Sequence, residues 1–198
     1  MTNVDKLFKR TFDLVVSLLG LFLSSPLIFL AWVVAAFETG SNGFFIQKRV
    51  GLNGFLFNVI KIKTMKNTSG YRSSITTEVS VQITKSGSFF RKYKIDELPQ
   101  LWNVLIGEMS FVGPRPDVPG YADKLSGSDR LVLSVRPGIT GPASIKYKNE
   151  EVILSSQSNA RLYNDEIIWP DKVKINKEYI NSYRFTDDIK YIVETIRG

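Results

Sequence analysis

The stretch that decides the fold is a charge-free apolar run from Leu14 to Phe37, LVVSLLGLFLSSPLIFLAWVVAAF. At about 1.5 Å per residue, a straight helix of this length would reach about 36 Å, and the hydrocarbon core of a bilayer is about 30 Å thick. The run is longer than the apolar region of a typical signal peptide, and Glu38 follows it in place of a small-residue cleavage site. A soluble helix this uniformly apolar would need a large protein around it. The sequence therefore predicts a membrane segment.

Ser25 and Pro26 stand in the middle of this run. Proline removes a backbone hydrogen bond and clashes with the carbonyl four residues earlier, so a helix break is expected there. Basic residues flank the run on both sides: Lys6, Lys9 and Arg10 before it, Lys48 and Arg49 after it. The positive-inside tendency assigns both flanks to the cytoplasmic side, which a re-entrant hairpin satisfies and a spanning helix does not. On the residues alone, a hairpin and an ordinary kinked spanning helix both remain open.

The composition limits the chemistry, because the 198 residues include no His and no Cys. This excludes imidazole bases, thiolate nucleophiles, disulfides and Cys/His zinc sites. Catalysis would have to use carboxylates, hydroxyls, Lys, Arg or a hard metal held by oxygen. The net charge of +7 lies entirely in residues 1–100, near the apolar run. Such a basic region suits anionic lipid headgroups or a polyanionic ligand, although any single lysine is also consistent with a solvated surface.

Beyond the apolar run, the residue patterns predict an α+β chain of short strands followed by helices. Strands are expected in the segments 43–46, 54–62 and 79–84, and helices in 88–94, 97–106 and from 186 to the C-terminus. The proline-rich stretch 112–142 predicts rigid loops. We therefore expect a re-entrant membrane helix-break-helix hairpin in residues 1–38 and a compact, mostly helical cytoplasmic catalytic domain with a few short strands in residues 39–198.

Asp96 and Glu97 are the strongest candidates for chemistry. They stand just before Pro99, which is tolerated only in the first turn of a helix. A helix N-terminus favours ionised carboxylates and also attracts phosphate. Adjacent residues of a helix point about 100° apart, so the two acids are expected to differ in role, one attacking an electrophile and the other holding a divalent cation. The alternative is that Asp96 is an N-cap and Glu97 a favourable first-turn acid.

Basic residues surround this acidic pair in the sequence. Arg91, Lys92 and Lys94 precede it, and Arg115 follows in a proline-flanked loop. Carboxylates together with cations suit phosphate chemistry, because Arg can grip a phosphate that carboxylates alone would repel. Arg136 lies in a second rigid loop, where a phosphate contact and a purely structural turn are equally compatible with the residues. The absence of GxxxxGK[ST] and of GxGxxG disfavours ATP-type and dinucleotide enzymes.

Several ordered motifs resemble those of the bacterial sugar transferases known as monotopic phosphoglycosyl transferases. They are Lys9-Arg10-Thr11-Phe12-Asp13, the apolar run with Ser25-Pro26, Gln47-Lys48-Arg49-Val50-Gly51, Lys61-Ile62-Lys63-Thr64-Met65, Asp96-Glu97-Leu98-Pro99-Gln100-Leu101-Trp102-Asn103, Gly113-Pro114-Arg115-Pro116 and Arg136-Pro137-Gly138-Ile139-Thr140-Gly141. Two departures are Lys94-Ile95, where the family usually has Ser or Thr with Leu, and Lys63, where Arg is common. Neither removes a residue that carries a proposed chemical role.

The resemblance implies a re-entrant helix broken at Ser25-Pro26 and a catalytic domain on the cytoplasmic face of the bacterial inner membrane. The aspartate matching Asp96 attacks the β-phosphate of a UDP-sugar, forms a covalent phosphosugar and releases UMP, and undecaprenyl phosphate then accepts the phosphosugar. The glutamate matching Glu97 binds Mg²⁺, with Mn²⁺ as a substitute. The basic residues that match phosphate-binding positions are Lys61, Arg91, Arg115 and Arg136.

This reaction would be the first membrane step of surface-glycan assembly, and downstream glycosyltransferases are candidate partners. The sugar pocket is expected around residues 142–148. A competing hypothesis is a non-catalytic membrane scaffold or lipid-binding module, against which the intact Asp96-Glu97 pair argues. Nucleic-acid binding is disfavoured by the apolar run and by the lack of a recognisable motif.

Overall fold

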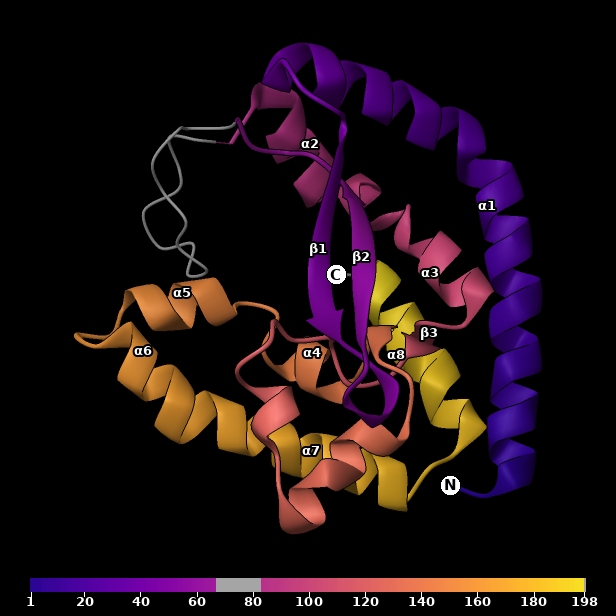
Figure 1. The fold of residues 1–198 in the computed structure, drawn as a ribbon, viewed down its shortest axis with the longest axis vertical. Coiled ribbons are helices and arrows are strands. Elements are labelled where there is room, and N and C mark those ends of the chain that lie inside the picture. The colour runs from indigo at the N-terminus through magenta and orange to yellow at the C-terminus, as the bar shows by residue number, and fades with distance from the viewer. Residues whose placement is uncertain (67–82, 198) are drawn as a thin grey trace.

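The computed structural model describes residues 1–66 and 83–197. Its longest element is the helix α1 (Asn3–Thr39), which forms one side of the molecule and bends over its top (Figure 1). A capping box of Thr2 and Asp5 starts this helix, and Gly40 ends it in the left-handed region with φ 63°. Both ends are therefore fixed by local sequence.

Pro26 lies inside α1 without interrupting it. Because proline has no N–H, the carbonyl of Phe22 loses its usual donor, and the Ser25 hydroxyl donates to that carbonyl at 3.0 Å. Ser24 likewise donates to the carbonyl of Gly20 at 2.6 Å. The prediction that the helix is interrupted at Ser25-Pro26 is thus wrong. α1 is one continuous, bent helix and not two separate helices. The Ser25 hydroxyl replaces the donor that Phe22 loses, which lets the helix continue.

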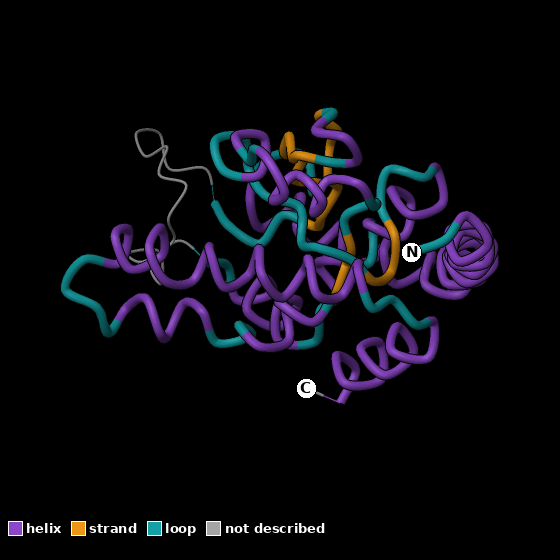
Figure 2. Tube along the Cα trace, turned by 90° about the horizontal axis from the view of Figure 1, so that it is seen from below, coloured by secondary structure: helices purple, strands orange, loops and turns teal. Residues whose placement is uncertain are grey.

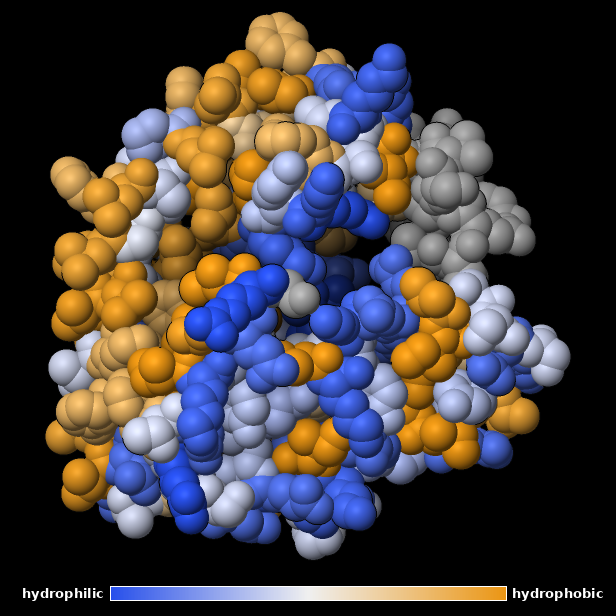
Figure 3. Space-filling view, turned by 180° about the vertical axis from the view of Figure 1, so that it is seen from behind, coloured by the Kyte–Doolittle hydropathy of each residue, from blue (hydrophilic) through white to orange (hydrophobic). Residues whose placement is uncertain are grey.

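Most of the apolar surface of α1 is uncovered. In its most apolar 18-residue window only 11% is buried, and α1 is the one helix of the described residues that is long and apolar enough to cross a membrane. Figure 3 shows these apolar side chains gathered along α1, beside a face hollowed near its middle and lined by hydrophilic ones. Phe22, Leu23 and Phe37 are each more than three-quarters exposed. This exposure suits a helix that faces lipid.

Two strands follow α1, at the segments predicted as 43–46 and 54–62. β1 (Phe44–Val50) and β2 (Leu56–Ile62) pair antiparallel, with Phe44 opposite Ile62 and Val50 opposite Leu56. Asn53 and Gly54 make the connection with positive φ values of 56° and 86°. The third predicted strand, 79–84, lies mostly outside the described residues, of which Ile83 forms a bridge with Met65.

A second small sheet was not predicted, and its second strand lies in the stretch 112–142 that was predicted to form loops. β3 (Ser110–Val112) runs parallel to β4 (Gly138–Thr140). The backbones approach so closely that a Cβ atom on Gly138 would lie 2.1 Å from the nitrogen of Gly113. Glycine is therefore required here, and the three-residue length of each strand left no periodic signal.

The helices confirm some predicted boundaries and correct others. α2 (Lys85–Lys92) begins at the Thr84 cap, whose Oγ1 accepts from the Gly87 N–H at 2.9 Å, and not at Ser88. α3 (Gln100–Ile106) ends at Gly107, with φ 89°, as predicted. The last helix, α8 (Phe185–Arg197), also begins where predicted. Four further helices were not predicted: α4 (Pro142–Lys146), α5 (Glu150–Ser155), α6 (Ala160–Tyr163) and α7 (Trp169–Asn181).

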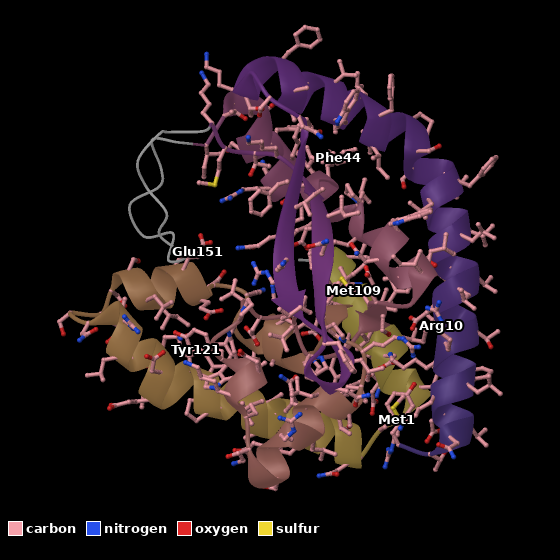
Figure 4. All side chains as sticks on the ribbon, viewed as in Figure 1. Met1, Arg10, Phe44, Met109, Tyr121 and Glu151 are labelled. Atoms are coloured by element: carbon pink, nitrogen blue, oxygen red, sulfur yellow. The ribbon has the colours of Figure 1, made fainter. Side chains whose placement is uncertain are left out.

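Helix α1 packs along α3 and reaches α2 and β2. Arg10 donates Nη1 to the carbonyl of Val104 at 2.6 Å and Nη2 to that of Leu105 at 2.8 Å, so it caps the C-terminal end of α3 (Figure 4). Seen from below, α1 lies nearly end-on at one side and α8 forms a separate layer under the small sheet (Figure 2). These contacts fix α3, and the acidic pair in front of it, relative to the apolar helix.

Candidate active site

Asp96 and Glu97 lie on a single 3-10 turn, Ile95–Glu97, directly before α3. Lys94 starts the turn in the left-handed region with φ 57°, one of two non-glycine residues in the described ranges with positive φ. Pro99 occupies the N-cap position of α3 and no side chain caps that helix. The alternative that Asp96 serves as an N-cap is therefore wrong.

The Glu97 carboxylate is held by two cations on one oxygen. Its Oε1 accepts from Lys61 Nζ at 2.9 Å and from Arg115 Nη2 at 2.8 Å. Burial alone would raise the pKa of Glu97, but Arg115 and Lys61 outweigh it and hold the pKa well below its usual range. Glu97 therefore stays ionised and fixed in orientation at any physiological pH.

The Asp96 carboxylate has the opposite environment. The residue is 9% exposed, and its Oδ1 is buried without a hydrogen-bond partner. Burial, followed by the neighbouring charge of Glu97, raises the pKa of Asp96, against the opposing effect of Lys61, Arg91 and Lys94. A buried acceptor without a partner is costly and indicates a strained or ligand-binding group. Two adjacent carboxylates whose pKa values are pushed apart are typical of a site that divides two chemical roles.

The predicted basic residues do not all gather at this pair. Lys61 on β2 and Arg115 in the loop after β3 bind Glu97 directly, and the charge of Arg91 reaches Asp96. The orientation of the Arg91 side chain is fixed by a hydrogen bond, in which its Nε donates to Thr64 Oγ1 at 3.0 Å. Arg136 instead donates Nε to the carbonyl of Gly107 at 2.7 Å, beyond the far end of α3. The structure therefore does not bring Arg136 to the acidic pair, and its predicted phosphate contact stays a prediction.

Two residues that the sequence analysis did not single out extend the site beyond Arg115. Arg49 donates to the Pro116 carbonyl at 3.2 Å and to Gln47 Oε1 at 2.6 Å. Burial raises the pKa of Asp117 to about 6, against the opposing charges of Lys172, Arg49 and Arg115. Arg115 and Asp117 also line a cavity of about 20 Å³. The motif around Arg49 could have indicated it, whereas no local signal marks Asp117.

The acidic pair fits a magnesium ion that shares its ligands with a substrate. The described residues contain no group of three or more His, Cys, Asp or Glu side chains placed to bind a metal. Mg²⁺ usually takes only one or two carboxylates and completes its shell with water and substrate phosphates. The ionised Glu97 carboxylate fits the role of the one protein ligand, and the unpartnered Asp96 oxygen beside it is left for the substrate.

The family of bacterial sugar transferases matches residues 4–198 of this chain. The chain belongs to the bacterial sugar transferase family. This sugar transferase is similar to the "Uncharacterized sugar transferase EpsL" of Bacillus subtilis (strain 168), at 34% identity over 96% of this chain and 86% of that protein. It is also 34% identical to the "Undecaprenyl-phosphate glucose phosphotransferase" of Komagataeibacter xylinus, over 100% of this chain but 36% of that longer protein.

A third relative is the "UDP-glucose:undecaprenyl-phosphate glucose-1-phosphate transferase" of Klebsiella pneumoniae. The identity is 32%, over 99% of this chain and 41% of that protein. With the family match, these relatives make the sugar transferase an enzyme of the phosphoglycosyl transferase type.

Proposed function

We propose that this sugar transferase moves a sugar 1-phosphate from a UDP-sugar to undecaprenyl phosphate and releases UMP. The observation that carries the proposal is Asp96, buried with an unpartnered oxygen beside a Glu97 that two cations hold. The relatives named for undecaprenyl phosphate support the acceptor, and the one named for UDP-glucose supports the class of donor. The product would be the first lipid-linked intermediate of a surface glycan.

In the first step, an Asp96 carboxylate oxygen attacks the β-phosphorus of the donor. The bond from that phosphorus to the oxygen bridging it to the α-phosphorus breaks, and its electron pair leaves with UMP. In the second step, a phosphate oxygen of undecaprenyl phosphate attacks the same phosphorus, and Asp96 departs as a carboxylate. The raised pKa of Asp96 makes the ionised carboxylate more basic and a better nucleophile than an ordinary aspartate.

Arg115 and Arg91 are the groups that would hold the donor phosphates. The side chain of Arg115 is 49% exposed, so its guanidinium can contact a ligand while Nη2 stays on Glu97. Arg91 is pre-oriented by Thr64, which reduces the entropy lost on binding a phosphate. Lys61, whose side chain is less exposed, would mainly keep Glu97 in place.

The proposed cofactor is Mg²⁺, with Mn²⁺ as a substitute, held by Glu97 together with phosphate oxygens of the donor. When bound, a hard divalent ion neutralises the diphosphate as the carboxylate approaches. EDTA should eliminate UMP release, and Mg²⁺ or Mn²⁺ should restore it. Full activity in EDTA would remove this role from Glu97.

We further propose that α1 is re-entrant, with the catalytic residues at the cytoplasmic face of the bacterial inner membrane. The bend of α1 (Figure 1) and the basic residues on both flanks support this topology, because a spanning helix would have to export Lys6, Lys9 and Arg10. The chain contains no cysteine, so Thr2→Cys can be probed on intact cells with an impermeant maleimide. We expect no labelling in the wild-type background, and labelling would show a spanning helix.

The reaction is tested by incubating the purified full chain with a panel of UDP-sugars, Mg²⁺ and undecaprenyl phosphate while UMP is measured. Without acceptor, the intact mass of the protein should rise by one phosphosugar, located on Asp96 by peptide mapping. Glu97→Gln should impair turnover while leaving the nucleophile in place. A phosphosugar on another residue would contradict the covalent step, and no UMP from any donor would favour the membrane-scaffold hypothesis.

A further inference from the structure

The buried side chain of Asn103 on α3 is bonded to the strand that carries Lys61. Asn103 is 0% exposed. Its side-chain amide both accepts a hydrogen bond from the backbone of β2 and donates one to it. Its Oδ1 accepts from the Ile60 N–H at 3.2 Å, and its Nδ2 donates to the Asn58 carbonyl at 2.8 Å. A side-chain amide carries the same pair of groups as a peptide, so Asn103 stands where a neighbouring strand would otherwise bond β2.

The position of Asn103 complements the pairing of β2 with β1. Val59 pairs with Gln47 of β1, whereas the polar groups of Asn58 and Ile60 reach the opposite edge of β2. β2 is thus bonded along both edges, by a strand on one side and by a single side chain on the other. The amide also has a fixed orientation, because Nδ2 donates to Glu108 Oε2 at 2.7 Å.

This bonding determines which face of β2 meets the acidic pair. Val59 packs against Val104 and Met109, and Lys61, two residues later, projects from the same face. Lys61 Nζ reaches Glu97 from there, at 2.9 Å. A slip of one residue would turn Lys61 to the other face of the strand. The hydrophobic contacts of Val59 resist such a slip but are not directional, whereas the two hydrogen bonds of Asn103 fit one register.

We propose that Asn103 is a positioning residue of the transferase, which sets the register of β2 against α3 and thereby places Lys61 on Glu97. Glu97 lies on the 3-10 turn directly before α3 and Asn103 lies within α3, so the turn and the helix each attach to β2, through Lys61 and through the Asn103 amide. The inference rests on the proposed function only for the use that catalysis makes of Lys61. The placement of Lys61 itself can be measured without any activity.

The first test measures how readily an amine-acylating reagent labels Lys61 in the folded full chain, with the modified site identified by mass spectrometry. Asn103→Ser should increase the labelling rate of Lys61 by about threefold or more, because the ammonium is released from Glu97. Lys172 is the internal reference, since its side chain is similarly exposed, 19% against 23%, and is also paired with a glutamate. Its rate should not change.

Asn176→Ser is the matched control, because it makes the same truncation at a buried asparagine on α7. It should leave the labelling of Lys61 unchanged. If Asn103→Ser does not fold, Glu108→Ala removes the group that orients the amide and should raise Lys61 labelling in the same direction, while Glu108→Gln keeps an acceptor and should not. Unchanged Lys61 labelling in the folded variant, Asn103→Ser or in its place Glu108→Ala, would overturn the proposal, as would an equal rise in Asn176→Ser.

The second measurement connects the placement to turnover. Asn103→Ser should lower kcat/KM for UMP release by about tenfold, and Asn176→Ser by less than about twofold. If the wild-type chain released no UMP from any donor, the proposed function would fail, yet the labelling comparison would still decide the role of Asn103. Lys61 labelling that rises without loss of turnover would overturn the catalytic part of the inference alone.

Discussion

Two clusters in this molecule each bury a carboxylate beside a lysine, and they differ in how completely the carboxylate is bonded. In the first, Asp188 of α8 accepts from Tyr179 on Oδ1 at 2.7 Å, and from Lys9 and Tyr183 on Oδ2 at 2.5 and 3.1 Å. In the second, Glu97 is bonded by Lys61 and Arg115, but the adjacent Asp96 keeps a buried oxygen without a partner.

This difference separates a structural cluster from a reactive one. Every oxygen of Asp188 is satisfied, and the cluster joins α1 to the C-terminal helices, so its effect is to hold the fold together. The unsatisfied oxygen of Asp96 destabilises the fold and is free to act as the proposed nucleophile. We therefore expect mutations in the first cluster to change stability, and mutations in the second to change activity.

Replacement of the nucleophile should have the largest effect. We expect Asp96→Asn to reduce UMP release by about a thousandfold or more, equivalent to about 4 kcal/mol of lost transition-state stabilisation, because an amide cannot attack phosphorus. Its thermal unfolding temperature should stay the same or rise, since a buried charge has been removed. Retention of more than about a tenth of wild-type turnover would contradict the covalent mechanism.

Breaking the structural cluster should produce the largest loss of stability. Lys9→Met leaves Asp188 buried without its cation, which should lower the free energy of unfolding by about 3 to 5 kcal/mol. Lys190→Met is the matched control, because Lys190 pairs with Asp187 on the same helix but is 74% exposed. It should cost less than about 1 kcal/mol in denaturant titrations. Equal losses in the two variants would remove the distinction between buried and exposed pairs.

Arg115 and Arg136 provide a smaller test of the contrast between a site contact and a structural contact. Arg115→Ala should raise the KM for the UDP-sugar by about thirtyfold, equivalent to about 2 kcal/mol, because a charge-assisted phosphate contact is lost. Arg136→Ala should leave KM unchanged and lower the free energy of unfolding by about 1 to 2 kcal/mol, because Arg136 donates to the Gly107 carbonyl and not to the acidic pair. A large increase in KM in Arg136→Ala would show that Arg136 contacts a substrate phosphate after all.

The last prediction concerns pH, through Asp117. Burial raises its pKa from 3.8 to about 6, so between these values the folded chain binds more protons at this site than the unfolded chain does. The contribution of Asp117 to stability is therefore present below pH 3.8 and is lost as pH rises towards 6. Asp117→Asn should flatten this part of the stability profile, as measured by thermal unfolding from pH 4 to 7. An unchanged slope would show that Asp117 does not titrate there.

The sequence predicted those elements whose signals are local. The strands predicted at 43–46 and 54–62 form β1 and β2, although β1 continues to Val50, and the end of α3 at Gly107 and the start of α8 follow from a left-handed glycine and first-turn acids. The β3–β4 pair was missed because it joins two three-residue segments far apart in the chain. The helix break at Ser25-Pro26 was wrong because the hydroxyl of Ser25 supplies the hydrogen bond that Pro26 removes.

By itself, the sequence determined the apolar helix, the absence of imidazole and thiol chemistry, and the candidate pair Asp96-Glu97, because composition and short-range spacing are properties of neighbouring residues. Only the tertiary structure decided which cations serve that pair. Lys61 and Arg115 lie 36 and 18 residues from Glu97, and they meet it because β2 and the loop after β3 pack against the same turn. Arg136 also lies in a rigid loop beside prolines, but the parallel pairing of β3 with β4 places it at the C-terminal end of α3. Such long-range contacts depend on packing, which no local pattern records.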